Sequence, residues 1–267
     1  MEDFSKTDYS YLDLPEVLMC IFHPRPERGI SNVSSAVLGV MIPVGEGVSI
    51  GGRFHMDHKE SPNILFFHGN GELASDYDDL GPLYNQIGIN FLVADYRGYG
   101  RSTGTPSVSA MMKDCHVIME FTRDWLSHRG FTGPLILMGR SLGSASVLEL
   151  AASYPEKVKG LIVESGFAFT LPLLSLLGVN LAALNVDEKK GFGNLDKIKT
   201  YNGPTLIIHA EMDQIIPFSD GQALFDASPA EQKTLLKIQR ANHNDIFLHG
   251  FQEYMDAVKN LSQMAKY

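Results

Sequence analysis

The stretch that most constrains the fold of this chain is residues 135–150, which read LILMGRSLGSASVLEL. Four apolar residues lead into a G-x-S-x-G turn centred on Ser141, and small and apolar residues at helical spacing follow. This order predicts a buried strand, a sharp turn and a helix. A serine at the centre of such a turn projects from the sheet on a strained backbone, and the two glycines let strand and helix approach closely. Ser141 is therefore predicted to be a nucleophile.

The rest of the chain from residue 63 onward repeats the alternation of strand and helix. Continuous apolar runs, typical of strands buried on both faces of a parallel sheet, occur at 64–67, 90–94, 135–138, 161–164, 206–209 and 234–238. Apolar residues three and four apart predict helices at 73–87, 107–128, 142–154, 218–227 and 251–266. The alternation predicts an α/β fold, a parallel sheet with helices on both faces. A length of 267 residues, 44% of them hydrophobic, predicts a single domain over residues 1–267.

The N-terminal region has a different pattern of polar and apolar residues. Residues 1–14 are polar and aromatic without periodicity, and we expect them to form an arm that lies on the domain. Three short β-rich runs follow, at 17–22, 36–42 and 48–56. Together they predict an antiparallel meander before the parallel part of the sheet.

Residues 166–202 form the longest segment between two predicted strands. The segment is too short for an independent domain and too apolar for a solvated loop. It predicts either one or two helices packed on the sheet edge or a small lid that lines an acyl pocket. The side chains expected to form the apolar wall of that pocket are Phe167, Phe169, Leu171, Leu174 and Leu177.

Composition excludes several kinds of partner. The formal charge is −9, and without a run of Lys or Arg no nucleic-acid partner is expected. Cys20 and Cys115 have neither the pattern of a disulfide framework nor the spacing of a zinc site, and both are expected to be reduced and buried. No stretch reaches the roughly 18 apolar residues of a membrane span. The acidic N-terminal sequence is unlike a signal peptide, so a cytoplasmic location is expected. Oligomeric state is not readable from the sequence.

A serine nucleophile needs a general base, and the base needs a carboxylate that orients it. Loops at the carboxyl ends of parallel strands converge on one crevice, so both partners are expected after late strands. Asp213 follows the strand at 206–209 and is predicted to be the acid, with Glu211 as the alternative. His243 lies in a polar loop after the last strand and is predicted to be the base.

The chain has nine histidines, and most of them are expected to be structural. His209 lies inside a predicted strand, His249 lies further into the last helix, and His68 is expected to brace the loop that follows the strand at 64–67. No histidine shares metal-ligand spacing with carboxylates or cysteines, so no metal site is predicted.

Attack on a carbonyl places negative charge on its oxygen, which backbone N–H groups stabilise when they are positioned in advance. One predicted donor is the N–H of Leu142, directly after the nucleophile. The other is the N–H of Asn70, in the loop His68-Gly69-Asn70-Gly71-Glu72, where two glycines let the backbone fold close to a substrate.

The sequence DYRGYGRS at residues 95–102 contains alternating glycines but not the GxGxxG spacing of a nucleotide-binding loop. It predicts a tight loop in which Asp95 and the nearby arginines form structural pairs. Arg140 is expected to pair with an acid of this loop, and no catalytic role is assigned to it.

These motifs, in this order, resemble those of the α/β-hydrolase superfamily. The resemblance rests on residues 68–71, residues 95–100, the turn at Ser141, Asp213 and His243, and it covers the chain from about residue 43 onward. It is closest to a small-cap group that includes serine aminopeptidase-like bacterial hydrolases and eukaryotic protein depalmitoylases. It implies an eight-stranded, mostly parallel sheet and acyl transfer to water without a cofactor.

Two departures from those relatives modify the expectation. The depalmitoylases carry a cysteine-rich, lipidated N-terminus, whereas this chain has only Cys20 near its start, so membrane residence is not expected. The segment 166–202 is short beside the large lids of many lipases, which implies a more open pocket.

The sequence therefore predicts a serine hydrolase that cleaves a small-molecule ester, thioester or other acylated substrate through an acyl-enzyme. One alternative is a peptidase, in which Glu72, Asp76 or Glu164 would capture a peptide terminus. A dehalogenase would place a carboxylate at the position of Ser141. A non-catalytic binding protein is the remaining alternative, because a fold alone does not determine function.

Overall fold

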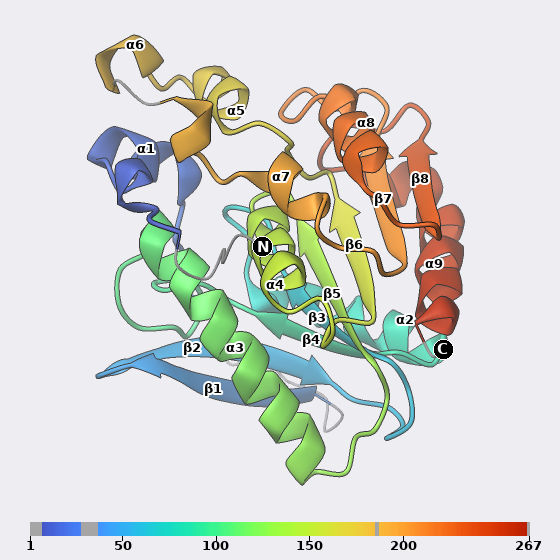
Figure 1. Ribbon diagram of the computed structural model, residues 1–267. Coiled ribbons are helices and arrows are strands. Elements are labelled where there is room, and N and C mark those ends of the chain that lie inside the picture. Colours follow the sequence, from blue (N-terminus) through green and yellow to red (C-terminus); the bar gives the residue numbers. More distant parts are fainter. Residues whose placement is uncertain (1–6, 28–36, 185–186, 266–267) are drawn as a thin grey trace.

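The computed structural model describes residues 7–27, 37–184 and 187–265. Within these residues, eight strands form one open sheet in the order β1-β2-β4-β3-β5-β6-β7-β8 (Figure 1). The strands are β1 (Val37–Gly45), β2 (Val48–His55), β3 (Asn63–Phe67), β4 (Asn90–Ala94), β5 (Leu135–Arg140), β6 (Gly160–Glu164), β7 (Thr205–Ala210) and β8 (Lys233–Ile238). β1 and β2 pair antiparallel, β2 pairs antiparallel with β4, and all remaining pairs are parallel. The predicted eight-stranded, mostly parallel α/β sheet is confirmed.

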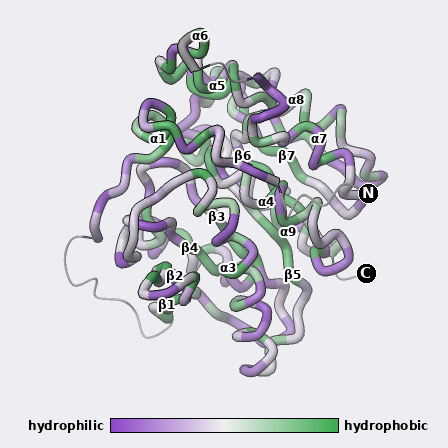
Figure 2. Tube along the Cα trace, turned by 60° about the vertical axis from the view of Figure 1, so that its left-hand side comes forward, coloured by the Kyte–Doolittle hydropathy of each residue, from purple (hydrophilic) through white to green (hydrophobic). Residues whose placement is uncertain are grey.

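Helices cover both faces of the sheet. The longer ones are α3 (Val108–His128), α4 (Gly143–Ser153), α8 (Phe218–Ala227) and α9 (Ile246–Met264). Side chains alternate between the two faces along each strand, so Leu65 and Phe67 of β3 pack in the core with α3 and α4, whereas Ile64 and Phe66 pack in the core with α9. Figure 2 shows the central strands in the hydrophobic colours, as burial on both faces requires.

The N-terminal region differs from the prediction. The run at 17–22 is not a strand but the end of helix α1 (Pro15–Ile21), which follows a short 3₁₀ turn, η2 (Ser10–Leu12). Proline is favourable at the first helical position, and Val17 and Ile21, four residues apart, bury one face of the helix. Within the described residues, the antiparallel part of the sheet therefore has two strands before β3 rather than three.

Helix boundaries differ in two other places. The predicted helix at 73–87 is broken into η3 (Ala74–Tyr77) and α2 (Gly81–Gln86), because Gly81 and Pro82 interrupt the helical run and form the first turn of a new helix. The last helix starts at Ile246, before the predicted residue 251, and bends at the non-helical Gly250. Residues 1–6 of the expected arm, residue 36 and residue 266 lie outside the described residues.

In the part of the segment 166–202 that the structure describes, there are four short helical pieces. They are α5 (Thr170–Leu176), α6 (Leu181–Leu184), η4 (Glu188–Lys190) and α7 (Asn194–Ile198). The Glu188 carboxylate accepts hydrogen bonds from the backbone N–H groups of Thr170 (2.6 Å) and Leu171 (2.8 Å), which satisfies the free donors at the start of α5. Figure 1 shows α5 and α6 at the end of the molecule beyond the carboxyl ends of the parallel strands.

Candidate active site

The turn between β5 and α4 places Ser141 at the carboxyl edge of the sheet. Ser141 has a φ of +52°, in the left-handed region that non-glycine residues rarely adopt. A Cβ on Gly143 would lie 2.0 Å from the Phe67 carbonyl oxygen, and one on Gly139 would lie 2.4 Å from the Gly143 carbonyl oxygen. Both positions therefore require glycine, and close packing of β5, α4 and β3 holds the serine in its strained conformation.

Ser141, His243 and Asp213 form a continuous chain of hydrogen bonds. The Ser141 Oγ lies 3.1 Å from His243 Nε2, and His243 Nδ1 lies 2.7 Å from Asp213 Oδ2. With Asp213 ionised, Nδ1 donates to the carboxylate and Nε2 is left to accept the serine proton. All three residues are buried, each 9% exposed or less.

Asp213 is held as a carboxylate by its surroundings. Burial acts to raise its pKa, but the hydrogen bond and charge of His243 and the N–H groups of Ile216 and Ile215 outweigh burial and hold the pKa of Asp213 below its ordinary value. Asp213 Oδ1 accepts from these two N–H groups at 2.8 and 2.9 Å. The alternative acid, Glu211, instead accepts from the backbone N–H of Arg240 at 2.9 Å.

His209, which was expected to be structural, helps to support this site. His209 Nε2 lies 2.9 Å from the Ile216 carbonyl oxygen, and burial lowers the pKa of His209, so its ring is neutral. His249 lies in α9 beside Asp245, 3.6 Å away, and belongs to the helix.

The loop after β3 brings Asn70 to the same pocket. Among the hydrogen bonds of the described residues, none is donated by the backbone N–H of Asn70 or of Leu142. The Asn70 side chain is fixed instead, because its Oδ1 accepts from the His23 backbone N–H and from the Tyr99 hydroxyl, each at 2.8 Å. Both residues predicted to supply oxyanion donors therefore line the pocket, and no acceptor in the described part of the chain bonds to their N–H groups.

His68 braces the loop beneath Asn70, and its partner corrects one expectation. Among the described residues Asp95 has no arginine partner; it lies 3.2 Å from His68 Nε2 and accepts from the Ala74 N–H at 2.8 Å. Arg97 pairs with Asp114 of α3 instead. The loop at 95–102 therefore supports the Asn70 loop through Tyr99 and through the contact of Asp95 with His68.

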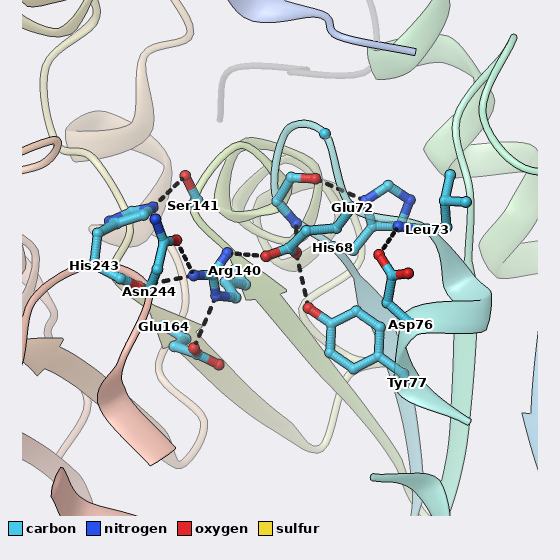
Figure 3. A network of polar contacts seen from close by, with 12 residues as sticks. His68, Glu72, Leu73, Asp76, Tyr77, Arg140, Ser141, Glu164, His243 and Asn244 are labelled. Atoms are coloured by element: carbon cyan, nitrogen blue, oxygen red, sulfur yellow. Dashed lines mark hydrogen bonds and ion pairs between the residues drawn. The ribbon is translucent and has the colours of Figure 1, made fainter. Parts of the chain in front are cut away.

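Arg140, in the turn beside the nucleophile, connects the loops of the site, and its partners also differ from the prediction. Its guanidinium bonds to Glu164 at the end of β6 (3.1 Å), to Glu72, and to the His243 carbonyl oxygen (2.8 Å) and Asn244 Oδ1 (3.0 Å) (Figure 3). Glu72 in turn accepts from the Gly69 N–H at 2.6 Å. Arg140 therefore connects the histidine loop with the Asn70 loop.

The Arg140 guanidinium is largely buried and lies between two carboxylates. Burial acts to lower the pKa of Arg140, but the charges of Glu72 and Glu164 outweigh it and raise that pKa. Burial raises the pKa of Glu164, whose other oxygen accepts from the Tyr254 hydroxyl at 2.6 Å. The sequence did not reveal this network, because Glu72, Arg140 and Glu164 are far apart along the chain.

A cavity of about 200 Å³ opens next to Ser141. Its lining comes from six parts of the chain: Cys20, Ile21, His23, Asn70, Arg140, Ser141, Leu142, Phe167, Thr170, Leu173, Leu174, Leu177, Phe192, Ile215, Ile216, His243 and Asn244. Three of the five predicted wall residues, Phe167, Leu174 and Leu177, line the cavity, whereas Phe169 and Leu171 do not. Cys20 is half-buried in this wall rather than buried as expected, and only Cys115 is fully buried.

A larger hollow of about 690 Å³ lies elsewhere, between the segment before β7 and the end of α9. It includes Gly203, Gln232 and Met264 and none of the predicted site residues. Since Gly203 and Gln232 precede strands β7 and β8, this hollow is at the amino ends of the strands. In α/β sheets the chemistry takes place at the opposite, carboxyl edge, where Ser141 lies.

No group of three or more histidines, cysteines, aspartates and glutamates that could hold a metal ion occurs in the described part of the chain. Among the same residues, no helix is both long and apolar enough to cross a membrane.

The sheet order, the strained turn at Ser141, and the positions of Asp213 and His243 after the last strands define the class of the protein. That class is the α/β-hydrolase fold. A family model described as serine aminopeptidase, S33, matches residues 58–183, a region that includes Asn70 and Ser141 and ends before Asp213 and His243.

Curated relatives extend the similarity along the chain. Human alpha/beta hydrolase domain-containing protein 17B is 33% identical over 216 residues, which cover 74% of this chain and 67% of the human protein. Alpha/beta hydrolase domain-containing protein 17C of Xenopus tropicalis is 30% identical over 264 residues, covering 95% of this chain and 73% of the relative. The chain belongs to the α/β-hydrolase superfamily.

Solved structures show the same fold. An esterase of Pyrococcus furiosus superposes with a TM-score of 0.72 at 16% identity, over 91% of this chain and 98% of that chain. Est1E of Butyrivibrio proteoclasticus with bound ferulic acid superposes with a TM-score of 0.69 at 19% identity, over 83% of this chain and 96% of that chain.

Proposed function

We propose that the protein is a serine hydrolase that cleaves carboxylic esters or thioesters through an acyl-enzyme. The observation that carries this proposal is the hydrogen-bonded chain from Asp213 through His243 to Ser141, which ends beside an apolar cavity. Membership of a hydrolase superfamily supports it.

In the first half of the reaction, the Ser141 Oγ forms a bond to the carbonyl carbon while its proton passes to His243 Nε2. The carbonyl oxygen takes up the negative charge, and the N–H groups of Asn70 and Leu142 donate to it. The tetrahedral intermediate then expels the alcohol or thiol, which leaves with the proton from His243. Asp213 stabilises the imidazolium that exists between these two transfers.

In the second half, water attacks the acyl-enzyme and gives its proton to His243. The bond between the acyl carbon and Ser141 Oγ breaks, the proton returns to that oxygen, and a carboxylic acid is released. The proton taken from Ser141 leaves with the alcohol or thiol, and the proton taken from water restores the serine hydroxyl, so each turnover balances without a cofactor.

The peptidase alternative has less support. The carboxylates that the sequence offered for binding a peptide terminus are engaged within the protein: Glu72 and Glu164 with Arg140, and Asp76 with Arg25. A free carboxylate aimed at the cavity is needed to pair with a peptide amino terminus, and these three do not supply it.

The proposal is tested with a fluorophosphonate probe and a panel of substrates. We expect the probe to label the wild-type protein and not Ser141→Ala, and turnover of p-nitrophenyl esters to fall by several orders of magnitude in that variant. Thermal unfolding of Ser141→Ala serves as the control and should be close to that of the wild type. Labelling that survives the substitution would exclude Ser141 as the nucleophile, and a preference for aminoacyl amides over esters and thioesters would favour a peptidase.

A further inference from the structure

The wall of the cavity beside Ser141 has a polar part and an apolar part. Polar groups gather at the end that holds Asn70, Ser141 and His243. The remaining wall is largely apolar and comes from two sources far apart in sequence: the N-terminal segment, with Cys20 and Ile21, and the segment after β6, with Phe167, Leu173, Leu174, Leu177 and Phe192. A ligand that fits has one reactive polar end and an aliphatic remainder.

Residues of helix α1 and of helix α5 both line this apolar part. Figure 1 shows both helices at the same end of the molecule, beyond the carboxyl ends of the strands. Ile21 of α1 is 4% exposed and Leu174 of α5 is 1% exposed, so the inner faces of both helices are packed. Met19, also on α1, is 75% exposed and is not among the residues that line the cavity.

The N-terminal segment is fixed at both ends of α1. Before the helix, the buried Tyr9 hydroxyl donates to Glu149 of α4 at 2.6 Å and accepts from Lys197 of α7 at 2.8 Å. After the helix, the His23 N–H donates to Asn70 Oδ1 at 2.8 Å. The Arg25 Nε then donates to the Gly71 carbonyl oxygen at 2.7 Å. Because the chain is held both before and after α1, this wall of the cavity is formed before a ligand binds, and it limits the size of the ligand that fits.

The volume of the cavity sets a scale for the aliphatic part. At roughly 30 Å³ for each water-sized group, a volume of about 200 Å³ holds about six or seven such groups. A methylene group is of similar size, so the cavity matches an acyl chain of medium length.

We propose that α1 is the acyl-selecting wall of this hydrolase: a medium-length aliphatic acyl chain lies between α1 and α5, and Cys20 and Ile21 limit its length. The inference rests on the proposed esterase function and assigns the substrate class. A bulkier side chain at Cys20 shortens the accepted chain, because one methylene more or less in an apolar pocket changes kcat/KM by about 10-fold or more.

The first test measures kcat/KM for p-nitrophenyl acetate and p-nitrophenyl octanoate with the wild type, Cys20→Trp and Met19→Trp. We expect the octanoate-to-acetate ratio to fall by about tenfold or more in Cys20→Trp. Met19→Trp is the matched control one residue away on the exposed face, and its ratio is expected to stay within about twofold of the wild type. Equal loss of both esters in Cys20→Trp would overturn the proposal.

The second test needs neither turnover nor a bulky substitution. In Ser141→Ala, the half-buried Cys20 is expected to react with N-ethylmaleimide ahead of the fully buried Cys115. We expect sodium octanoate to slow this alkylation and sodium acetate at the same concentration to leave it unchanged. Absence of protection by octanoate would overturn the proposal even where esters are hydrolysed. Absence of probe labelling and ester hydrolysis in the wild type would instead refute the proposed function, and the alkylation result would still decide whether the wall binds an acyl chain.

Discussion

Replacing Arg140 by methionine removes the cation that pairs with both Glu72 and Glu164. The Arg140 side chain is 11% exposed and that of Glu164 is 3% exposed, so water cannot take over the missing charge. Removing one partner of a buried ion pair costs about 3–5 kcal/mol, because the other charge stays buried without compensation. At roughly 2–4 °C per kcal/mol for a chain of this size, the melting temperature is expected to fall by about 6–20 °C.

The measurement is thermal unfolding followed by circular dichroism, with two comparisons. Arg123→Met is the matched control, since Arg123 pairs with Glu120 on the exposed surface of α3 and such a pair contributes about 1 kcal/mol or less. Arg140→Met combined with Glu164→Gln is expected to recover part of the lost stability, because the buried negative charge is gone. A melting temperature of Arg140→Met equal to that of Arg123→Met would refute the reasoning.

Arg140→Lys separates charge from geometry. Lysine keeps a cation near Glu164 but lacks the planar fork that bonds to Glu72 and to the His243 carbonyl oxygen at the same time. We expect kcat for a short ester to fall while KM changes little, since the lost bonds position His243 and do not contact the substrate. A wild-type kcat in Arg140→Lys would contradict this positioning role.

Two further predictions concern folding. Burial, with the nearby charge of Arg53, lowers the pKa of His55 from 6.5 to about 4. Between these pH values the unfolded chain therefore binds a proton that the folded chain does not. The free energy of unfolding is expected to decrease by up to about 3 kcal/mol as pH falls through this window. Urea titrations of the wild type and His55→Leu at pH 7 and pH 4.5 check this, and an equal pH dependence in both would contradict it. Gly143→Ala would place a Cβ 2.0 Å from the Phe67 carbonyl oxygen, so we expect loss of probe labelling together with a large drop in melting temperature. Gly178→Ala, which has a positive φ but open space around it, is expected to cost only about 1–2 kcal/mol, and equal effects of the two substitutions would contradict the steric argument.

The parts of this protein that were predictable from sequence depend on local patterns. Buried parallel strands read as continuous apolar runs, so β4 and the core of β5 were located from the sequence. The strained turn at Ser141 was predictable because G-x-S-x-G between a strand and a helix is itself a local pattern. Asp213 and His243 were selected because they follow late strands, and the structure brings both within hydrogen-bonding distance of each other.

The parts that were not predictable depend on contacts between distant segments. Helix α1 was read as a strand because its seven residues are too few to show helical periodicity clearly, although Pro15 and the spacing of Val17 and Ile21 were the available signals. The Arg140 partners come from loops that only the folded sheet brings together. For the same reason the sequence assigned the pocket to residues 166–202 alone and missed the side contributed by Cys20 and Ile21.

The bond between Lys197 and Tyr9 spans 188 positions along the chain, which has a consequence for the order of folding. Contacts so far apart in sequence form slowly, because a large loop must close before they contribute. During synthesis at about 5–20 residues per second, the N-terminal segment waits roughly 10–40 s before its partner has been made. The contact of Asp13 with Ser109 of α3 is available earlier, whereas the contact of Tyr9 with Lys197 is not. The side of the cavity that is synthesised first is therefore among the last to be completed.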